Sequence, residues 1–591
     1  MKDSDDERAA APDTSCPPWA LREYAVLADG ERGAVLDPRG RIVWLCAPRW
    51  HDDAVFSALI GGAGHFTVEP ADPWHVWGGF YEEGTLIRVS RWVTSGCVIE
   101  CREALAMPSR TDRLVLLRRL RVERGEARLK LGLDPRPGFG EARMPEPRRE
   151  GGVWTAGTEG LRMRLAGAPD AVWRDTAGLC GDFRLLEGET HDLVLELSTQ
   201  RETEPLDADA LWRSTEREWR RAVPDCSRLV APRDARHAYA VLRGLTSVSG
   251  GMVAAATTSL PERANSGRNY DYRYAWLRDQ CYVGLAVAAH GPHPLVDDAV
   301  RFVAERILAD GDEVRPAYTV DGRPVGHERS LRLPGYPGGN DHVGNDAGAQ
   351  FQLDTFGEAL QLFAAAAAHD RLTEEAPRAA VVAVDVVERQ WLKPEAGLWE
   401  LEDRWWTHSR LSVVCGLRRM AEVLPGNEGR RCTELADTVL RETRRRCLLP
   451  DGRWRRAEDD DGPEAALLVP MARGCTFGDH HDAATRACIE SRLTEDGYLF
   501  RFEHPGESLG EAEGAFLLCG FTMALATHRV GDRVGAFRWF ERTRAACGPP
   551  GLFAEEYDVR QRQLRGNLPQ AFVHAMMLEC AVRLAGESTL P

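Results

Sequence analysis

The sequence lacks the features that mark several common protein classes. No apolar run approaches the ~20 residues that a membrane-spanning helix needs. The amino terminus, residues 1–9, is acidic and has no apolar core of the kind found in secretory signals. Basic residues number 75 against 91 acidic ones, for a net charge of −16. We therefore expect a cytoplasmic protein with no membrane or nucleic-acid partner, acting on a neutral small molecule.

The sequence also has few signs of a metal, a cofactor or a disulfide framework. Its 15 cysteines are scattered without paired short spacings, which fits a reducing compartment. The Gly-rich loop 333–345 is not followed by Lys-Ser/Thr, which argues against a nucleotide site. No His-x-x-x-His spacing occurs, and adjacent histidines on a helix point to different faces. We predict no metal and no cofactor, although His342, His408, His480 and His481 are conceivable ligands.

The first part of the chain, 1–205, has the pattern of a β domain. A chain of 591 residues is longer than one core usually holds, so more than one domain is expected. Several short runs alternate apolar and polar residues, as half-buried antiparallel strands do. Many such runs separated by turn signals predict a β-sandwich. The expected strands are 34–36, 41–45, 84–93, 97–101, 114–122, 127–133, 161–165, 183–186 and 191–198.

The rest of the chain has helical periodicity. Residues 206–230 are predicted to form a linker helix, and 231–591 a helical domain with sparse strand signals. A closed ring of helix pairs, with loops gathered at one end around a pocket, accounts for this pattern. The expected helices are 235–248, 277–290, 295–308, 346–368, 376–391, 408–424, 430–447, 463–472, 480–493, 512–531, 534–546 and 568–585.

The stretch 268–279 is unusually rich in both aromatic and charged residues for a helix entry. It carries Tyr272, Trp276, Arg278 and Asp279 directly before an apolar helix. Flat rings beside fixed donors and acceptors suit the C–H faces and hydroxyls of a sugar. A helix start with an acidic first turn and a surface ion pair explains the same residues equally well.

Two later loops carry glutamates that fit acid/base chemistry. Glu400 follows Trp399 directly, and a carboxyl against an indole can have a pKa raised enough to donate a proton near neutrality. Glu555, kept ionised, would complete an acid/base pair for glycoside hydrolysis. The alternative is that both are ordinary loop glutamates.

Several ordered motifs together resemble glycoside hydrolase family 15, which includes glucoamylases, glucodextranases, isomaltose glucohydrolases and bacterial-type trehalases. They are Asn269-Tyr-Asp-Tyr-Arg-Tyr-Ala-Trp-Leu-Arg-Asp279, Gly397-Leu-Trp-Glu400, Glu513-Gly-Ala-Phe-Leu-Leu-Cys519, Ala554-Glu-Glu556 and Gly566-Asn-Leu-Pro-Gln-Ala-Phe-Val-His574. The runs beginning at Tyr24 and Gly40 are similar to the trehalase-like β domain that precedes the catalytic domain in part of this family.

The resemblance implies a multidomain β + α fold, an N-terminal antiparallel β-sandwich followed by an (α/α)6 barrel. It also implies exo-acting hydrolysis of an α-glucosidic bond with inversion to β-glucose, so that the carboxyls should stand ~6.5–9.5 Å apart. By motif, Glu400 is the general acid and Glu555 the general base. The implied substrate-binding residues are Tyr272, Trp276, Arg278, Asp279, Trp399 and Glu556.

The sequence departs from the family pattern near the expected leaving-group side. Leu401 stands where fungal members have a second acidic residue, 407–412 lacks the lysine of many trehalase-like members, and 340–345 lacks their Pro-Val-Arg form. We therefore expect short α-glucosides of the isomaltose or malto-oligosaccharide type, with trehalose as the alternative. A sugar phosphorylase and a non-catalytic sugar-binding protein remain alternatives from other classes. The sequence does not determine which glycosidic linkage is preferred. It also leaves the oligomeric state open, and a homo-oligomer is one possibility.

Overall fold

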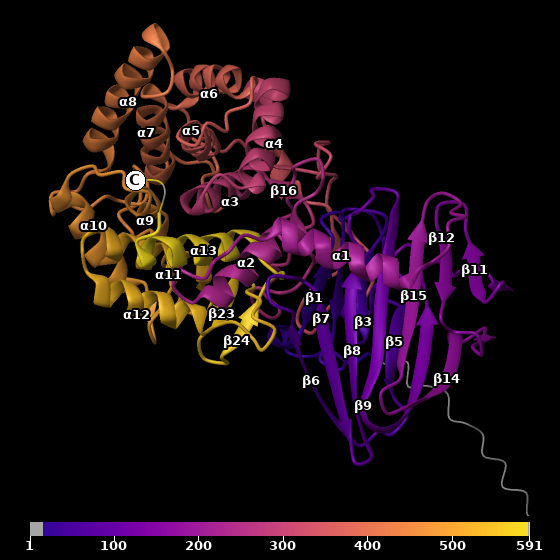
Figure 1. Ribbon diagram of the computed structural model, residues 1–591. Coiled ribbons are helices and arrows are strands. Elements are labelled where there is room, and N and C mark those ends of the chain that lie inside the picture. The colour runs from indigo at the N-terminus through magenta and orange to yellow at the C-terminus, as the bar shows by residue number, and fades with distance from the viewer. Residues whose placement is uncertain (1–15, 589, 591) are drawn as a thin grey trace, which may run out of the picture. The chain divides into compact units, whose positions relative to one another are not determined.

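The computed structural model describes residues 16–588 and 590. The chain divides into two compact units, and helix α1 (Ala208–Ala222) runs across the division between Glu216 and Arg217. The first unit contains the strands of the amino-terminal part (Figure 1). The second contains the helical part, together with the short segments Ala20–Arg22 and Glu83–Leu86.

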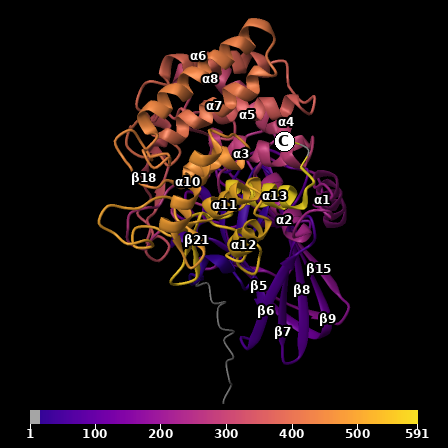
Figure 2. The same ribbon diagram turned by 90° about the vertical axis from the view of Figure 1, so that its left-hand side faces the viewer.

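The first unit is a β-sandwich of two antiparallel layers. One layer has the order β1-β2-β3-β5-β9-β14-β13 with β4 on β3, and the other has the order β6-β7-β8-β9-β15-β12-β11-β10. Strands of the second layer run side by side in Figure 2. The bounds are β1 Ala25–Ala28, β2 Gly33–Leu36, β3 Ile42–Cys46, β4 Ala54–Phe56, β5 His65–Pro70, β6 His75–Tyr81, β7 Arg88–Thr94, β8 Cys97–Leu105, β9 Arg113–Asp134, β10 Arg148–Glu150, β11 Val153–Gly157, β12 Arg162–Ala166, β13 Val172–Arg174, β14 Gly178–Leu186 and β15 Thr190–Ser198.

Strand β9 joins the two layers. Its first half pairs with β8 and β15, and its second half, from Glu126 onward, pairs with β5 and β14. The sequence predicted two strands here, 114–122 and 127–133, but the structure has one continuous strand of 22 residues. The apparent break is a bend, because Gly125 adopts a φ of 78° and the register against β8 shifts between Val98 and Ile99.

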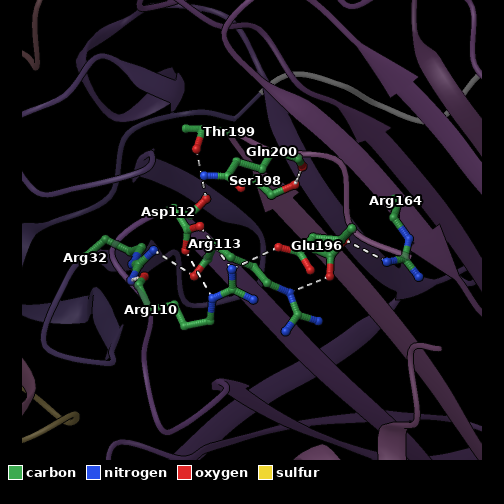
Figure 3. Close-up of polar contacts among 10 residues, drawn as sticks. Arg32, Arg110, Asp112, Arg113, Arg164, Glu196, Ser198, Thr199 and Gln200 are labelled. Atoms are coloured by element: carbon green, nitrogen blue, oxygen red, sulfur yellow. Dashed lines mark hydrogen bonds and ion pairs between the residues drawn. The ribbon is translucent and has the colours of Figure 1, made fainter. Parts of the chain in front are cut away.

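Buried arginine–carboxylate pairs hold parts of the sandwich together. Arg118 lies 2.7 Å from Glu103, and neither side chain is exposed. Glu196 on β15 accepts from Arg113 at 2.6 Å and from Arg164 at 3.2 Å, one from each neighbouring strand (Figure 3). Each buried charge therefore has an opposite charge at hydrogen-bond distance, as burial requires.

The second unit is an (α/α)6 barrel. Helices α3, α5, α7, α9, α11 and α13 contact one another in a closed ring, and α2, α4, α6, α8 and α12 pack outside against members of that ring (Figures 1 and 2). The inner helices are Leu277–His290, Asp354–Ala367, Thr407–Ala421, Leu468–Ala472, Leu517–Arg529 and Ala571–Ala585. The helices α2, α4, α6, α8, α10 and α12 are Pro232–Leu245, Pro294–Asp310, Ala376–Gln390, Gly426–Cys447, Asp479–Arg492 and Arg533–Arg544.

Sequence composition explains which helices lie inside. Nearly all of the fifteen residues in α13 and of the fourteen in α3 are buried, so both helices are buried on every side. Outer helices such as α8 carry charged residues on one face and bury the other. The predicted helices overlap the observed ones, but α5, α9 and α11 begin later than expected, at Asp354, Leu468 and Leu517.

The residues before several inner helices are extended and not helical. Short strands there pair with neighbouring loops, which fixes the backbone at one end of the barrel. They are β16 Ala275–Trp276, β17 Ala317–Tyr318, β18 Arg329–Ser330, β19 His342–Val343, β20 Thr494–Glu495, β21 Tyr498–Leu499, β22 Ala515–Phe516, β23 Glu556–Asp558 and β24 Gln563–Arg565. Among residues 16–588 and 590, no helix combines the length and apolar character needed to cross a bilayer.

Candidate active site

A pocket of about 310 Å³ opens where the inner helices begin. Its wall comes from the loops before α3, α5, α7 and α13 and from segments near β21 and β22, so residues far apart in sequence meet there. Of the predicted site residues, those that line it are Tyr272, Trp276, Arg278, Asp279, Trp399, Glu400 and Glu555. Asn345, the last residue of the Gly-rich loop 333–345, and Gln350, which follows that loop, also line it.

The stretch 268–279 forms one side of this pocket. Strand β16 pairs with β17 through Ala275 and Trp276, which holds the backbone extended until α3 begins at Leu277. Tyr272 and Trp276 lie edge to face, with ring centroids 5.5 Å apart. The two rings therefore fix each other, and each reaches a different carboxylate of the pocket.

Glu400 is held by Trp276. The Trp276 Nε1–H donates to Oε1 of Glu400 at 2.7 Å, and Arg278 Nη1 lies 3.5 Å from the same oxygen. Glu400 has a φ of 57°, a left-handed conformation that costs a non-glycine residue roughly 1–3 kcal/mol. At Gly397, also at positive φ, a Cβ atom would stand 2.7 Å from Trp406, so the tight turn requires glycine.

Glu555 is buried and held by Tyr272. Its side chain accepts from the Tyr272 hydroxyl at 2.9 Å on Oε2 and at 3.1 Å on Oε1. Burial raises the pKa of Glu555 well above its usual range, and the negative charge of Glu262 raises it further. Arg501 and the Tyr272 hydrogen bond oppose this rise by favouring the ionised form.

Arg278 and Asp279 lie at the first turn of α3. Arg278 donates to the carbonyl of Leu398 at 2.8 Å, which ties α3 to the loop that carries Glu400. Its Nε lies 3.3 Å from Asp279. Burial raises the pKa of Asp279 to about 6, against the lowering effect of Arg278. These two side chains offer a donor and an acceptor beside each other in the pocket wall.

Trp399 lines the pocket but does not supply the indole bond to Glu400. Its Nε1–H donates instead to Glu464, and Glu464 is paired with Arg456 at 2.8 Å. Its ring packs edge to face on Phe516, with centroids 5.1 Å apart. The indole that contacts Glu400 comes from Trp276, 124 residues earlier in the chain.

Glu556 does not line the pocket, contrary to the sequence prediction. Its side chain is fully buried behind the wall, where Oε2 accepts the Gly514 backbone N–H at 2.7 Å. Glu555 is the residue before β23, and Glu556 is the first residue of that strand. Glu556 therefore connects two loops of the wall.

Four charged residues of this pocket were not predicted from the sequence: Glu262, Glu328, Asp346 and Arg501. Arg501 forms a two-bond pair with Glu513, which Arg268 also contacts at 2.8 Å. Glu513 begins one of the family motifs, and Glu262 lies six residues before Arg268, so proximity to recognised motifs was the only available signal. Within residues 16–588 and 590, no cluster of three or more His, Cys, Asp or Glu side chains is arranged to hold a metal ion.

Comparisons with known proteins agree with this architecture. The family model for glycosyl hydrolases family 15 matches residues 236–582, and the trehalase-like N-terminal model matches residues 17–217. A trehalase from Mycobacterium tuberculosis is 30% identical, over 96% of this chain and 90% of that protein. A trehalase from Mycolicibacterium smegmatis is 29% identical, over 98% and 93%.

A solved structure supports the fold. The bacterial glucoamylase complexed with acarbose superposes with a TM-score of 0.68, covering 97% of this chain and 95% of that one at 14% identity. This likeness bears on the fold alone, whereas the family match extends through most of the helical domain. The chain is therefore a glycosidase, and it belongs to glycosyl hydrolases family 15.

Proposed function

We propose that the protein is an exo-acting, inverting α-glucosidase whose substrate is trehalose. One observation carries the reaction type: two carboxyl groups line one pocket, each held by a different ring of the same short stretch, Tyr272 on Glu555 and Trp276 on Glu400. The substrate rests on the relatives, because proteins named trehalase align along nearly the whole chain. The alternative substrate of the sequence analysis is therefore favoured over isomaltose and malto-oligosaccharides.

The two glutamates have complementary roles in this proposal. Glu400, which is a quarter exposed, protonates the glycosidic oxygen as its bond to the anomeric carbon breaks. Glu555 removes a proton from a water molecule, whose oxygen attacks that carbon from the opposite face. For trehalose the attacked unit leaves as β-glucose, and the other unit leaves as α-glucose. The proton gained by Glu555 and the one lost by Glu400 are exchanged with solvent before the next turnover.

The remaining wall residues bind and orient the sugar. Arg278 and Asp279 offer a donor and an acceptor that suit the hydroxyls of the terminal glucose. Trp276 and Trp399 offer apolar ring surface for its C–H groups. Because Arg278 also contacts Glu400 and the Leu398 carbonyl, binding at this end would be coupled to the position of the acid.

Isomaltose or a short malto-oligosaccharide is the second candidate substrate. Leu401, an apolar residue where fungal family members have an acid, lines the same pocket as Glu400. An apolar residue there changes what the leaving group contacts. The preferred leaving group is then expected to differ from that of the fungal family members. The reaction and the two carboxyl roles would be unchanged.

A panel of sugars tests the proposal. Trehalose, isomaltose and maltose are incubated separately with the protein, with and without phosphate, and glucose and glucose 1-phosphate are measured. Trehalose should give the highest kcat/KM and only glucose. A preference for isomaltose or maltose would move the assignment to the second candidate. Glucose 1-phosphate as product would exclude hydrolysis, and turnover of none of the sugars would favour a binding protein.

A further inference from the structure

Glu262 is a buried carboxyl in the pocket wall that the roles above do not use. It lies in the loop before the stretch 268–279, where its backbone N–H donates to the Arg268 carbonyl at 3.2 Å. Its side chain is only 6% exposed, and the residue lines the same pocket as Glu555. A carboxyl in such a place loses hydration and needs a partner.

The carboxyl beside Glu262 is that of Glu555. Both side chains lie against Gly566, where a Cβ atom would stand 3.6 Å from Oε2 of Glu555 and 3.8 Å from Cγ of Glu262. A carboxylate can only accept a hydrogen bond, so a bond between two carboxyls requires one of them to carry a proton. Two ionised carboxylates in contact would also repel each other strongly.

The charged residues around Glu262 and Glu555 leave enough positive charge to balance one negative charge on these two carboxyls. Arg501 and Arg268 both act on Glu262, but their shared partner Glu513 neutralises one of the two positive charges. His504 also contacts Glu513, at 3.2 Å. One positive charge is left for Glu262 and Glu555 together. The other titratable groups that act on the pair are Tyr270, Tyr272, Asp279 and Glu556.

We propose that Glu262 shares one proton with Glu555 and thereby sets the pH at which Glu555 becomes available as the general base. Glu262 is then a positioning residue, because it acts through Glu555 and need not touch the substrate. This inference rests on the proposed function for the role of Glu555. It assigns to Glu262 a task separate from binding and from proton donation to the leaving group.

The asymmetry of the surroundings decides the direction of the effect. Burial raises the pKa of both glutamates, but the neighbouring Glu555 lowers the pKa of Glu262, whereas the negative charge of Glu262 raises the pKa of Glu555. Glu262 therefore ionises first, and its charge holds the proton on Glu555 to higher pH. A base whose pKa approaches the working pH accepts a proton more effectively than an ordinary glutamate does.

The pH dependence of kcat/KM for Glu262→Gln tests this inference. The amide keeps a hydrogen-bond donor beside Glu555 but cannot carry the negative charge. The acid limb of the profile should therefore move to lower pH by about one unit or more. The matched control is Glu490→Gln on the exposed face of α10, which removes the same charge far from the pocket and should leave the limb in place. A limb that stays in place in Glu262→Gln, or moves to higher pH, would overturn the inference, and a merely structural role would lower kcat/KM without moving the limb.

A spectroscopic measurement tests the shared proton without turnover. Infrared difference spectra of wild-type and variant proteins, taken at one pH above the Glu262 transition, report protonated carboxyls through their C=O stretching band. Both Glu262→Gln and Glu555→Gln should lose the intensity of one protonated carboxyl relative to wild type, and Glu490→Gln should not. Unchanged intensity in both pocket variants would reject the shared proton. If wild type hydrolyses no α-glucoside, the proposed function fails, and the spectra still decide whether the pair holds one proton.

Discussion

The hydroxyl of Tyr272 lies 2.9 Å from Oε2 and 3.1 Å from Oε1 of Glu555. The two residues are 283 positions apart in the sequence, and the contact aims both carboxylate oxygens at one donor. Four residues after Tyr272, Trp276 makes the corresponding bond to Glu400 at 2.7 Å. One short stretch thus orients both carboxyl groups that the proposed mechanism uses, and the first prediction removes one of these bonds.

Replacing Tyr272 by Phe keeps the ring but removes the donor to Glu555. A hydrogen bond to a charged group contributes about 1.5–3 kcal/mol, so kcat/KM should fall roughly 10- to 100-fold. Steady-state kinetics on the preferred sugar measure the loss. Tyr498→Phe is the control, because Tyr498 is also buried but lies outside the pocket wall, and it should stay near wild type. Equal losses in the two variants would argue against a role for the Tyr272 bond.

The two glutamates can be told apart by the leaving group. Glu400→Gln and Glu555→Gln should each lower kcat by roughly 10²–10⁴-fold on trehalose. Fluoride leaves without protonation, so α-glucosyl fluoride should restore much of the rate in Glu400→Gln and little in Glu555→Gln. Fluoride release measures this directly. Rescue of Glu555→Gln instead would exchange the assigned roles.

The anomeric form of the first products tests inversion. Proton NMR early in the hydrolysis of trehalose should show α- and β-glucose in equal amounts, before mutarotation mixes them. In H₂¹⁸O the label should enter the β-glucose alone, because water attacks only that unit. Initial release of α-glucose without β-glucose would instead indicate retention.

Asp279 gives a stability prediction with a defined sign. Its pKa is raised from 3.8 to about 6 by burial, so the folded state binds its proton more tightly than the unfolded state does. The corresponding stability is present below pH 3.8 and lost as pH rises through about 6. The amide in Asp279→Asn does not titrate, so the melting temperature of this variant relative to wild type should rise between pH 4 and pH 7. The free-energy change is on the order of 2–3 kcal/mol, and a difference that is flat with pH would contradict it.

The sandwich offers a matched pair of ion-pair variants. Glu103→Ala leaves the Arg118 guanidinium buried without its carboxylate, which should destabilise this unit by roughly 3–5 kcal/mol. Glu100→Ala removes a looser pair with the half-exposed Arg91, at 3.7 Å, and should cost no more than about 1 kcal/mol. Thermal unfolding followed by circular dichroism compares the two. Similar shifts in melting temperature would mean that burial does not decide the cost.

The periodicities and motifs of the amino-acid sequence were enough to predict helices, strands and the two candidate glutamates. Helical spacing predicted the helices of the barrel, because the inner ones are apolar on every side and the outer ones on one face. Alternation predicted eight of the fifteen strands of the sandwich and missed β1, β4, β5, β6, β10, β11 and β13. It divided β9 because the bend at Gly125 resembles a turn in sequence. The family motifs identified Glu400 and Glu555 without any distance between them.

The tertiary structure, and not the sequence pattern, decided which side chains contact one another in the pocket. Three features depend on loops before different inner helices that converge at one end of the barrel. Trp276 and not Trp399 bonds Glu400, Glu556 lies behind the wall, and Glu262 lies beside Glu555 at Gly566. Local periodicity fixes the face of a helix or strand, but it carries no information on contacts between loops hundreds of residues apart. Closure of the helix ring supplies those contacts, and with them the environment that sets the charge of each carboxyl.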